Sequence, residues 1–222
     1  WSLPSVDEIA FSNRPVVRQI ALEKCEGDYI AEGETMRESF PELVWSQSGK
    51  PTKVCLGPRG QREDWDRFKS VCPSIVEAVE QLLHSFSDQK VEVTFGDVLD
   101  YGPGHLLGWH QDSMDLTRHL FTVVLTLASE GSGRCEWRKI AEDGQELQEV
   151  VSSTMPALGN LAIHGLTCNN ELAHRVFWDE GRRLALVLFC RSPEIEALLK
   201  GKGAQSRLSM RYWWRKEHEK VK

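Results

Sequence analysis

The stretch YGPGHLLGWHQD, residues 101–112, decides how the fold of this chain is interpreted. The turn sequence Gly102-Pro103-Gly104 separates one extended stretch from a shorter one that leads to His110 and Asp112. In a strand, residues i and i+2 point to the same face, so this imidazole and this carboxylate can meet at one point. Many exposed strands contain an HxD pair by chance, and a metal site needs a third ligand from a distant strand.

His174, in the sequence ELAHRV, is the candidate for that third ligand. Two imidazoles and one carboxylate on one face of an ion leave other positions open, as in non-haem Fe(II) sites that bind a co-substrate and O₂. Arg183 follows nine residues later and begins the apolar stretch RLALVLF. A buried cation is costly unless an anion meets it, and a guanidinium group holds a carboxylate with two parallel hydrogen bonds. The pattern favours a metal site with a carboxylate-binding arginine beside it.

The surrounding sequence predicts a mainly β fold. Short β-rich stretches separated by turns predict strands at residues 91–101, 120–128, 134–140, 149–153, 160–164, 173–178 and 184–190. Before them, Pro73 opens a helix whose apolar residues recur at helical spacing: Ile75, Val76, Val79, Leu82, Leu83 and Phe86. We expect a sandwich or jelly roll over 91–199, preceded by a helical and loop layer over 1–90 and followed by a basic, aromatic tail over 200–222.

The order YGPGxxxxxHxD, a middle strand, AHRV and GRRLALVLF resembles the Fe(II)- and 2-oxoglutarate-dependent dioxygenases, above all their prolyl 4-hydroxylase-like branch. The resemblance covers residues 91–191, which is under half of the chain. It implies a double-stranded β-helix, the cupin-like form of the jelly roll.

The same resemblance implies roles for individual residues. His110, Asp112 and His174 would bind Fe(II), and Arg183 would bind the distal carboxylate of 2-oxoglutarate. Tyr101 matches a tyrosine that often helps to hold this co-substrate. Arg182 is the neighbouring alternative to Arg183, but it should point to the opposite face.

Further candidates stay open between two interpretations. Thr126, fourteen residues after Asp112, either supports the co-substrate or is an ordinary strand threonine. His164 either projects toward the cavity or is a core histidine, and Trp178 either lines the substrate mouth or caps the core. Arg191 lies seventeen residues after His174, where AlkB-like enzymes have an arginine.

The chemistry that the resemblance implies is oxidative decarboxylation of 2-oxoglutarate to succinate and CO₂. O₂ is consumed, a C–H bond is hydroxylated, and ascorbate serves as reductant. Asp112 favours hydroxylation, because halogenating relatives have a small residue there. A protein or peptide residue, such as proline, is the first expected substrate. A free amino acid or other small molecule is an alternative, and a non-catalytic jelly-roll binding module is the rival from another class.

An AlkB-like nucleic-acid base demethylase is another alternative. Two departures count against it: Ala197 stands in place of a second arginine, and Leu99 in place of an asparagine. The charge distribution leaves a nucleic-acid partner open. The net charge is −6, but residues 200–222 carry +6, which leaves −12 on residues 1–199. The basic tail either contacts an anionic partner or packs as an edge strand.

Other features bound the class of protein. No apolar run reaches the roughly 18–20 residues needed to span a bilayer, so we expect a soluble, intracellular chain. The chain begins at Trp1, which suggests truncation and hides any targeting segment. The six scattered cysteines predict free, mostly buried thiols. The oligomeric state is not predicted.

Overall fold

The computed structural model describes residues 4–22, 26–57, 62–86, 91–112, 119–141 and 147–201. The strands are β1 (Val16–Gln19), β2 (Val44–Trp45), β3 (Thr52–Gly57), β4 (Glu92–Tyr101), β5 (His105–His110), β6 (Phe121–Ile140), β7 (Leu147–Thr154), β8 (Asn160–His164) and β9 (Leu172–Arg191). The helices are α1 (Val6–Phe11), α2 (Glu26–Ser39), α3 (Arg62–Val71), α4 (Pro73–Ser85), α5 (Leu166–Glu171) and α6 (Pro193–Gly201), with a 3₁₀ turn η1 (Pro41–Leu43). The protein is mainly β, as predicted.

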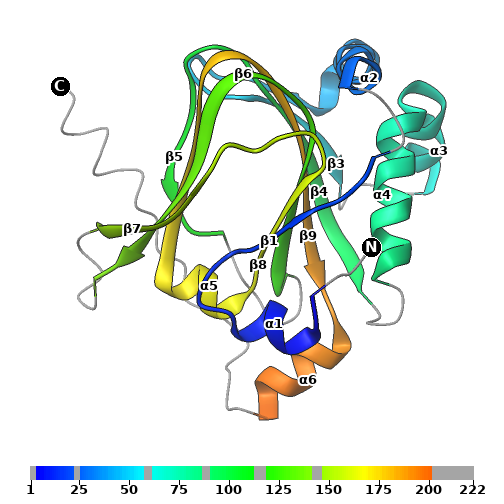
Figure 1. The fold of residues 1–222 in the computed structure, drawn as a ribbon. Helices are drawn as coiled ribbons and strands as arrows, with labels where there is room; N and C mark the ends of the chain where they lie inside the picture. The colour runs from blue at the N-terminus through cyan, green and yellow to red at the C-terminus, as the bar shows by residue number, and fades with distance from the viewer. Residues whose placement is uncertain are drawn as a thin grey trace.

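The long strands β6 and β9 organise the fold, because they pair with each other along almost their whole length and bend together midway (Figure 1). The first part of β6 and the last part of β9 belong to a large sheet in the order β1-β8-β6-β9-β4-β3-β2. The last part of β6 pairs with β7, and the first part of β9 pairs with β5. These strands form a small sheet facing the large one. This arrangement is the predicted jelly roll.

The bend corrects one prediction. Residues 120–128 and 134–140 were expected as separate strands, but they form one continuous strand, β6, and the same is true of 173–178 and 184–190 in β9. Gly131 (φ +81°) lies opposite Gly181 (φ +73°) at the bend. A Cβ atom on Gly131 would lie 2.1 Å from the carbonyl oxygen of Glu180. Because both positions are glycine, the strands turn sharply without leaving the hydrogen-bonded ladder.

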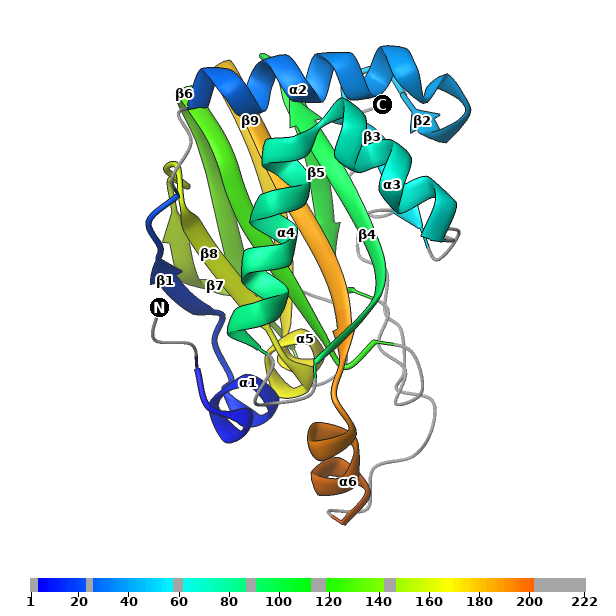
Figure 2. The same cartoon turned by 90° about the vertical axis from the view of Figure 1, so that its right-hand side faces the viewer.

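The outer face of the large sheet is covered by α2, α3 and α4 (Figure 2). Helix α4 confirms the prediction from Pro73, which occupies the first turn, and it buries Ile75, Val76, Val79 and Leu82. Helix α2 was not predicted, because few of its residues are apolar; among them Tyr29 and Met36 are buried. Residues 1–90 also contribute β1, β2 and β3 to the sheet, beyond the helices and loops expected there.

Other predictions have mixed outcomes. The five cysteines in the described part of the chain are all free, and four of them are buried, as predicted. Among the described residues, no helix has the length and apolar character needed to cross a membrane. Cys25 and residues 202–222 of the basic tail lie outside the described residues, so the tail stays a prediction.

Candidate active site

The three predicted metal ligands come together between the two sheets. Pairing of β5 with β9 places His110 opposite His174, and Asp112 follows β5 by two residues. One ligand atom from each residue lies within 4.8 Å of the others, and Asp112 Oδ1 is 3.9 Å from the Nε2 atoms of both histidines. Ligand atoms about 2.1 Å from one ion lie roughly 3–4 Å apart. The three side chains therefore fit a metal ion with small adjustments.

The hydrogen bonds and burial of these residues suit metal binding. His110 Nδ1 is 2.7 Å from the carbonyl oxygen of Gly108; because a carbonyl only accepts, Nδ1 carries the proton and Nε2 presents its lone pair. Burial, reinforced by His110, lowers the pKa of His174 well below its usual range and keeps that ring neutral. Burial opposes the charge on Asp112, but the histidines around it hold its pKa below the usual range. The site presents two imidazoles, that of His174 kept neutral, and one carboxylate.

The position of Asp112 corrects the expectation that it shares a strand face with His110. Strand β5 ends at His110, and Asp112 lies in the following loop. Asn169 on α5 holds that loop: its Nδ2 donates to the carbonyl oxygen of Asp112 (2.6 Å), and its Oδ1 accepts from the Asp112 backbone N–H (2.7 Å). Gln111 donates to the carbonyl oxygen of Asn169 (2.5 Å). A tertiary clamp, and not strand alternation, brings this carboxylate to the metal centre.

His164 contacts the site from β8. It is buried, and its Nδ1 lies 3.2 Å from Asp112 Oδ2, while Oδ1 faces the other two histidines. The two interpretations left open by the sequence are both correct, because His164 is a core histidine that reaches the cavity. Its contact leaves Oδ1 of Asp112 as the oxygen for the metal.

Arg183, the predicted carboxylate-binding residue, is 2% exposed and lines the same cavity as the three ligands. Its Nη2 donates to Thr126 Oγ1 (3.1 Å), its guanidinium lies 5.3 Å from the ring centroid of Tyr101, and its Nε has no partner. Among the described residues, no carboxylate lies within ion-pair distance of it. Burial raises the pKa of Tyr101, only partly opposed by Arg183, so its phenol stays neutral. The three predicted co-substrate residues therefore form one buried cationic pocket.

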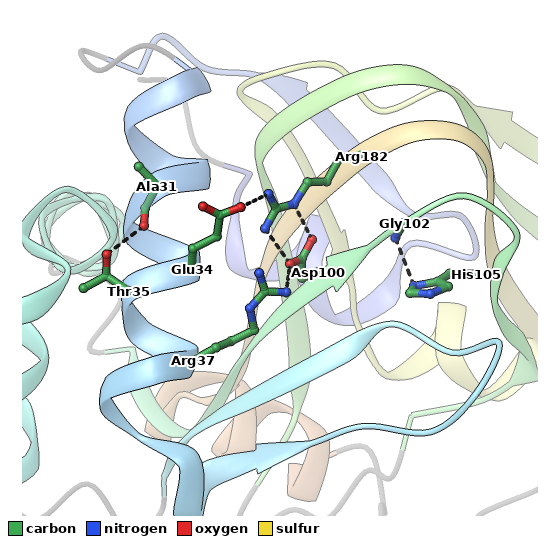
Figure 3. Close-up of polar contacts among 8 residues, drawn as sticks. All are labelled: Ala31, Glu34, Thr35, Arg37, Asp100, Gly102, His105 and Arg182. Atoms are coloured by element: carbon green, nitrogen blue, oxygen red, sulfur yellow. Dashed lines mark hydrogen bonds and ion pairs between the residues drawn. The ribbon is translucent and has the colours of Figure 1, made fainter.

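Arg182 points to the other side of β9, as expected, and takes part in a clamp with α2 (Figure 3). Its guanidinium donates twice to Asp100 (2.8 Å for each bond) and once to Glu34 (2.6 Å). Arg37 of α2 also donates to Asp100. These hydrogen bonds raise the pKa of Arg182, with Asp100 the main cause, and tie α2 to the strands that carry Tyr101 and Arg183.

The cavity has a volume of about 250 Å³. Its walls include Leu99, Val124, Val187 and Phe189, so the metal centre and the cationic pocket share a mainly apolar enclosure. An enclosure of this kind strengthens the electrostatic interactions inside it, because it excludes water.

Two substrate-side candidates lie outside this cavity, and Trp178 takes the second of the two positions left open for it, in the core. Trp178 is fully buried, its Nε1 donates to the carbonyl oxygen of Glu130 (3.0 Å), and its ring packs so closely on Gly133 that a Cβ there would lie 2.1 Å from it. Arg191 pairs with Glu92 (2.7 Å). Neither side chain lines the cavity, because one fills the core and the other is held in an ion pair outside it.

Comparison with known proteins gives a match only at the level of structure. No protein-family model and no curated protein matches the sequence. A prolyl 4-hydroxylase from Pseudomonas putida aligns with a TM-score of 0.51 and 20% identity, over 84% of this chain and 96% of that chain. A prolyl hydroxylase from Trichoplax adhaerens, solved with a peptide fragment of the hypoxia-inducible factor oxygen degradation domain, aligns with a TM-score of 0.57 and 14% identity, over 87% and 90%. The chain therefore has the fold of the prolyl hydroxylases, the branch of the 2-oxoglutarate oxygenases that its motifs resemble.

Proposed function

We propose that this protein is an Fe(II)- and 2-oxoglutarate-dependent dioxygenase that hydroxylates a C–H bond of a protein or peptide residue and releases succinate and CO₂. One observation carries the proposal: the buried guanidinium group of Arg183, which has no anionic partner among the described residues, shares a cavity with two histidines and a carboxylate. A dicarboxylate with an α-keto group would offer a partner to each of these groups. One carboxylate meets Arg183, and the keto acid end meets the metal.

Each residue of the site has a role in this proposal. His110, His174 and Asp112 Oδ1 would hold the metal, and His164 contacts the other oxygen of Asp112. Arg183, with Thr126 and the phenol of Tyr101, orients the distal carboxylate of 2-oxoglutarate. The metal, when bound with 2-oxoglutarate and O₂, supplies the oxidising chemistry. The fold supplies orientation and an enclosure that excludes water.

A peptide substrate is supported by the structural relatives, which are prolyl hydroxylases, one of them solved with a peptide. The AlkB-like alternative gains no support from the site. Leu99 is an apolar wall residue of the cavity, and Arg191 is held by Glu92.

A 2-oxoglutarate turnover screen tests the proposal. The wild-type protein with Fe(II) should release succinate slowly without substrate and faster with a peptide pool than with free amino acids or methylated oligonucleotides. Asp112→Ala should abolish both rates, whereas Asp179→Ala, which removes an exposed aspartate of β9, should retain them. Wild-type turnover in Asp112→Ala would refute the metal assignment, and stimulation by another pool alone would replace the peptide class.

A further inference from the structure

A carboxylate outside the predicted metal ligands also lines the cavity and has no role in the chemistry described above. Along β4, Tyr101, Leu99 and Asp97 alternate onto the cavity face. Asp97 is 6% exposed, and its Oδ1 has no hydrogen-bond partner in the part of the chain that the structure describes. A buried carboxylate oxygen without a donor carries an uncompensated desolvation cost. The cavity therefore contains an acceptor that lacks its donor.

The nearest cation does not satisfy this acceptor. Lys53 on β3 places its Nζ 3.6 Å from Asp97 Oδ2, and its side chain is 34% exposed. Burial raises the pKa of Asp97 to about 6, although Lys53 lowers it. The contact with Lys53 therefore offsets only part of the desolvation and leaves Oδ1 free.

The position of Asp97 separates it from the co-substrate pocket. Arg183 pairs with Tyr101, four residues further along β4, which corresponds to roughly 13 Å at about 3.3 Å per residue. A carboxylate held by Arg183 therefore does not meet Asp97. Asp97 instead pairs with Val187, which also lines the cavity.

Asp97 also lies toward the side of the cavity that edge strand β2 borders. Leu99 pairs with Lys53, and Lys53 pairs with Trp45 on β2, so these three side chains line one row of the cavity wall. Trp45 is 46% exposed, and its ring already lies 5.7 Å from the ammonium group of Lys53. An exposed tryptophan face attracts ammonium and guanidinium groups.

We propose, on the basis of the dioxygenase function above, that Asp97 is a substrate-recognition residue whose free Oδ1 accepts a hydrogen bond from a protonated amine or guanidinium group of the substrate. A charged donor forms a stronger bond to a carboxylate than a neutral one. Trp45 contributes a cation-attracting surface at the mouth, and the acidic balance of residues 1–199 favours approach of a basic molecule. The substrate class is a lysine or arginine side chain in a peptide, or the free basic amino acid.

Matched substrate pairs test this proposal. Peptides that differ only in lysine against norleucine, or arginine against citrulline, are compared with the corresponding free amino acids by kcat/KM for succinate release and by mass spectrometry of the product. The wild type should prefer the basic member by about 10- to 100-fold. In Asp97→Asn the preference should fall to near one. Lys53→Met should keep it, because Lys53 is not the recognised group.

Direct binding gives a readout independent of turnover. Calorimetric titration of Nα-acetyl-lysine amide and Nα-acetyl-norleucine amide into protein loaded with Mn(II) and 2-oxoglutarate should show the same preference and the same loss in Asp97→Asn. Thermal unfolding verifies that each variant is folded.

The outcomes separate the two proposals. Succinate release by the wild type without substrate tests the dioxygenase function alone. Equal use of basic and neutral members by an active wild type overturns the role of Asp97, as does a preference that persists in Asp97→Asn. If the wild type shows no turnover, the dioxygenase function fails, and a calorimetric result without preference for the basic probe overturns recognition by Asp97 as well.

Discussion

Replacing Arg183 with methionine should separate co-substrate binding from folding stability. The guanidinium is 2% exposed and has one side-chain hydrogen bond, to Thr126, while its Nε has no partner. Methionine fills a similar elongated volume without charge. In Arg183→Met, a bound carboxylate would lose the cation that compensates its own burial.

The magnitudes follow from this environment. Removing one partner of a buried ion pair costs about 3–5 kcal/mol, so the Kd of 2-oxoglutarate should rise by at least about 100-fold. Without ligand, the unfolding free energy of Arg183→Met should be either higher than that of the wild type or lower by no more than about 1 kcal/mol. The lost hydrogen bond to Thr126, worth about 1 kcal/mol, is opposed by removal of an unpaired buried charge.

Thermal unfolding with Mn(II), with and without 2-oxoglutarate, measures both quantities. At 100 times the wild-type Kd, the ligand should stabilise the wild type by about 2.7 kcal/mol, or roughly 5–11 °C. The same concentration should stabilise Arg183→Met by about 0.4 kcal/mol, or roughly 1 °C.

Arg182→Met is the matched control. It leaves the buried carboxylate of Asp100 with Arg37 alone, so it should lower the unfolding free energy by about 2–3 kcal/mol. Its affinity for 2-oxoglutarate should stay within about twofold of the wild type, because Arg182 lies outside the cavity. A normal ligand-induced shift in Arg183→Met, or an equal loss in both variants, would refute the assignment of Arg183.

Three further predictions address the surrounding residues. His164→Phe should weaken metal binding by about 10- to 100-fold in a metal titration while the protein stays folded, because Asp112 Oδ2 loses its contact with His164. An unchanged metal affinity would exclude a role of His164 in positioning Asp112. Asn169→Ala should lower the unfolding free energy, measured in urea, by about 2–4 kcal/mol, since two backbone groups of Asp112 lose their partner. A loss below about 0.5 kcal/mol would contradict the role of Asn169 in holding the Asp112 loop. Asp97→Asn should be more stable than the wild type by about 3 kcal/mol at pH 8, with no difference below about pH 4. The pKa of Asp97 is raised from 3.8 to about 6, so the folded state binds the proton of this carboxyl more tightly than the unfolded state does. The unfolding free energy of the wild type therefore falls as the pH rises through 6. Denaturant curves at both pH values measure the difference between the two proteins, and a pH-independent difference would count against the prediction.

Local spacing was sufficient to predict much of this site. The alternation of strand residues separates Arg183, inside the cavity, from Arg182, outside it, as observed. The HxD pair, together with the resemblance of the segments around it and around His174 to a dioxygenase pattern, predicted the cluster of His110, Asp112 and His174 without knowledge of the pairing between β5 and β9. These features depend on periodicity and residue chemistry, which a single sequence displays.

The features that were missed depend on contacts between distant segments. Asn169 holds Asp112 from a six-residue helix, and its available signal was a polar pair, Asn169-Asn170, in the short segment between two expected strands. His164 reaches the site because β8 pairs with β6, which the sequence does not specify. Asp97 resembled an ordinary polar residue of an alternating strand, and only the register of β4 with β3 and β9 reveals it as a cavity residue.

The strand boundaries were missed for a different reason. Residues 129–133, between two expected strands, were interpreted as a turn. In the fold, Gly131 faces Gly181 and the ladder continues through the bend. Whether a glycine ends a strand or bends it depends on the residue opposite, which is a property of the sheet.

The measurement that tests the central claim most directly is calorimetric binding of 2-oxoglutarate to the wild type and to Asp112→Ala, each with and without Mn(II). The site predicts one binding event per chain in the wild type that needs the metal, because the three ligands and Arg183 hold opposite ends of the same molecule. It predicts no such event in Asp112→Ala. Binding to the wild type that is equally tight without metal, or that persists unchanged in Asp112→Ala, would contradict the account.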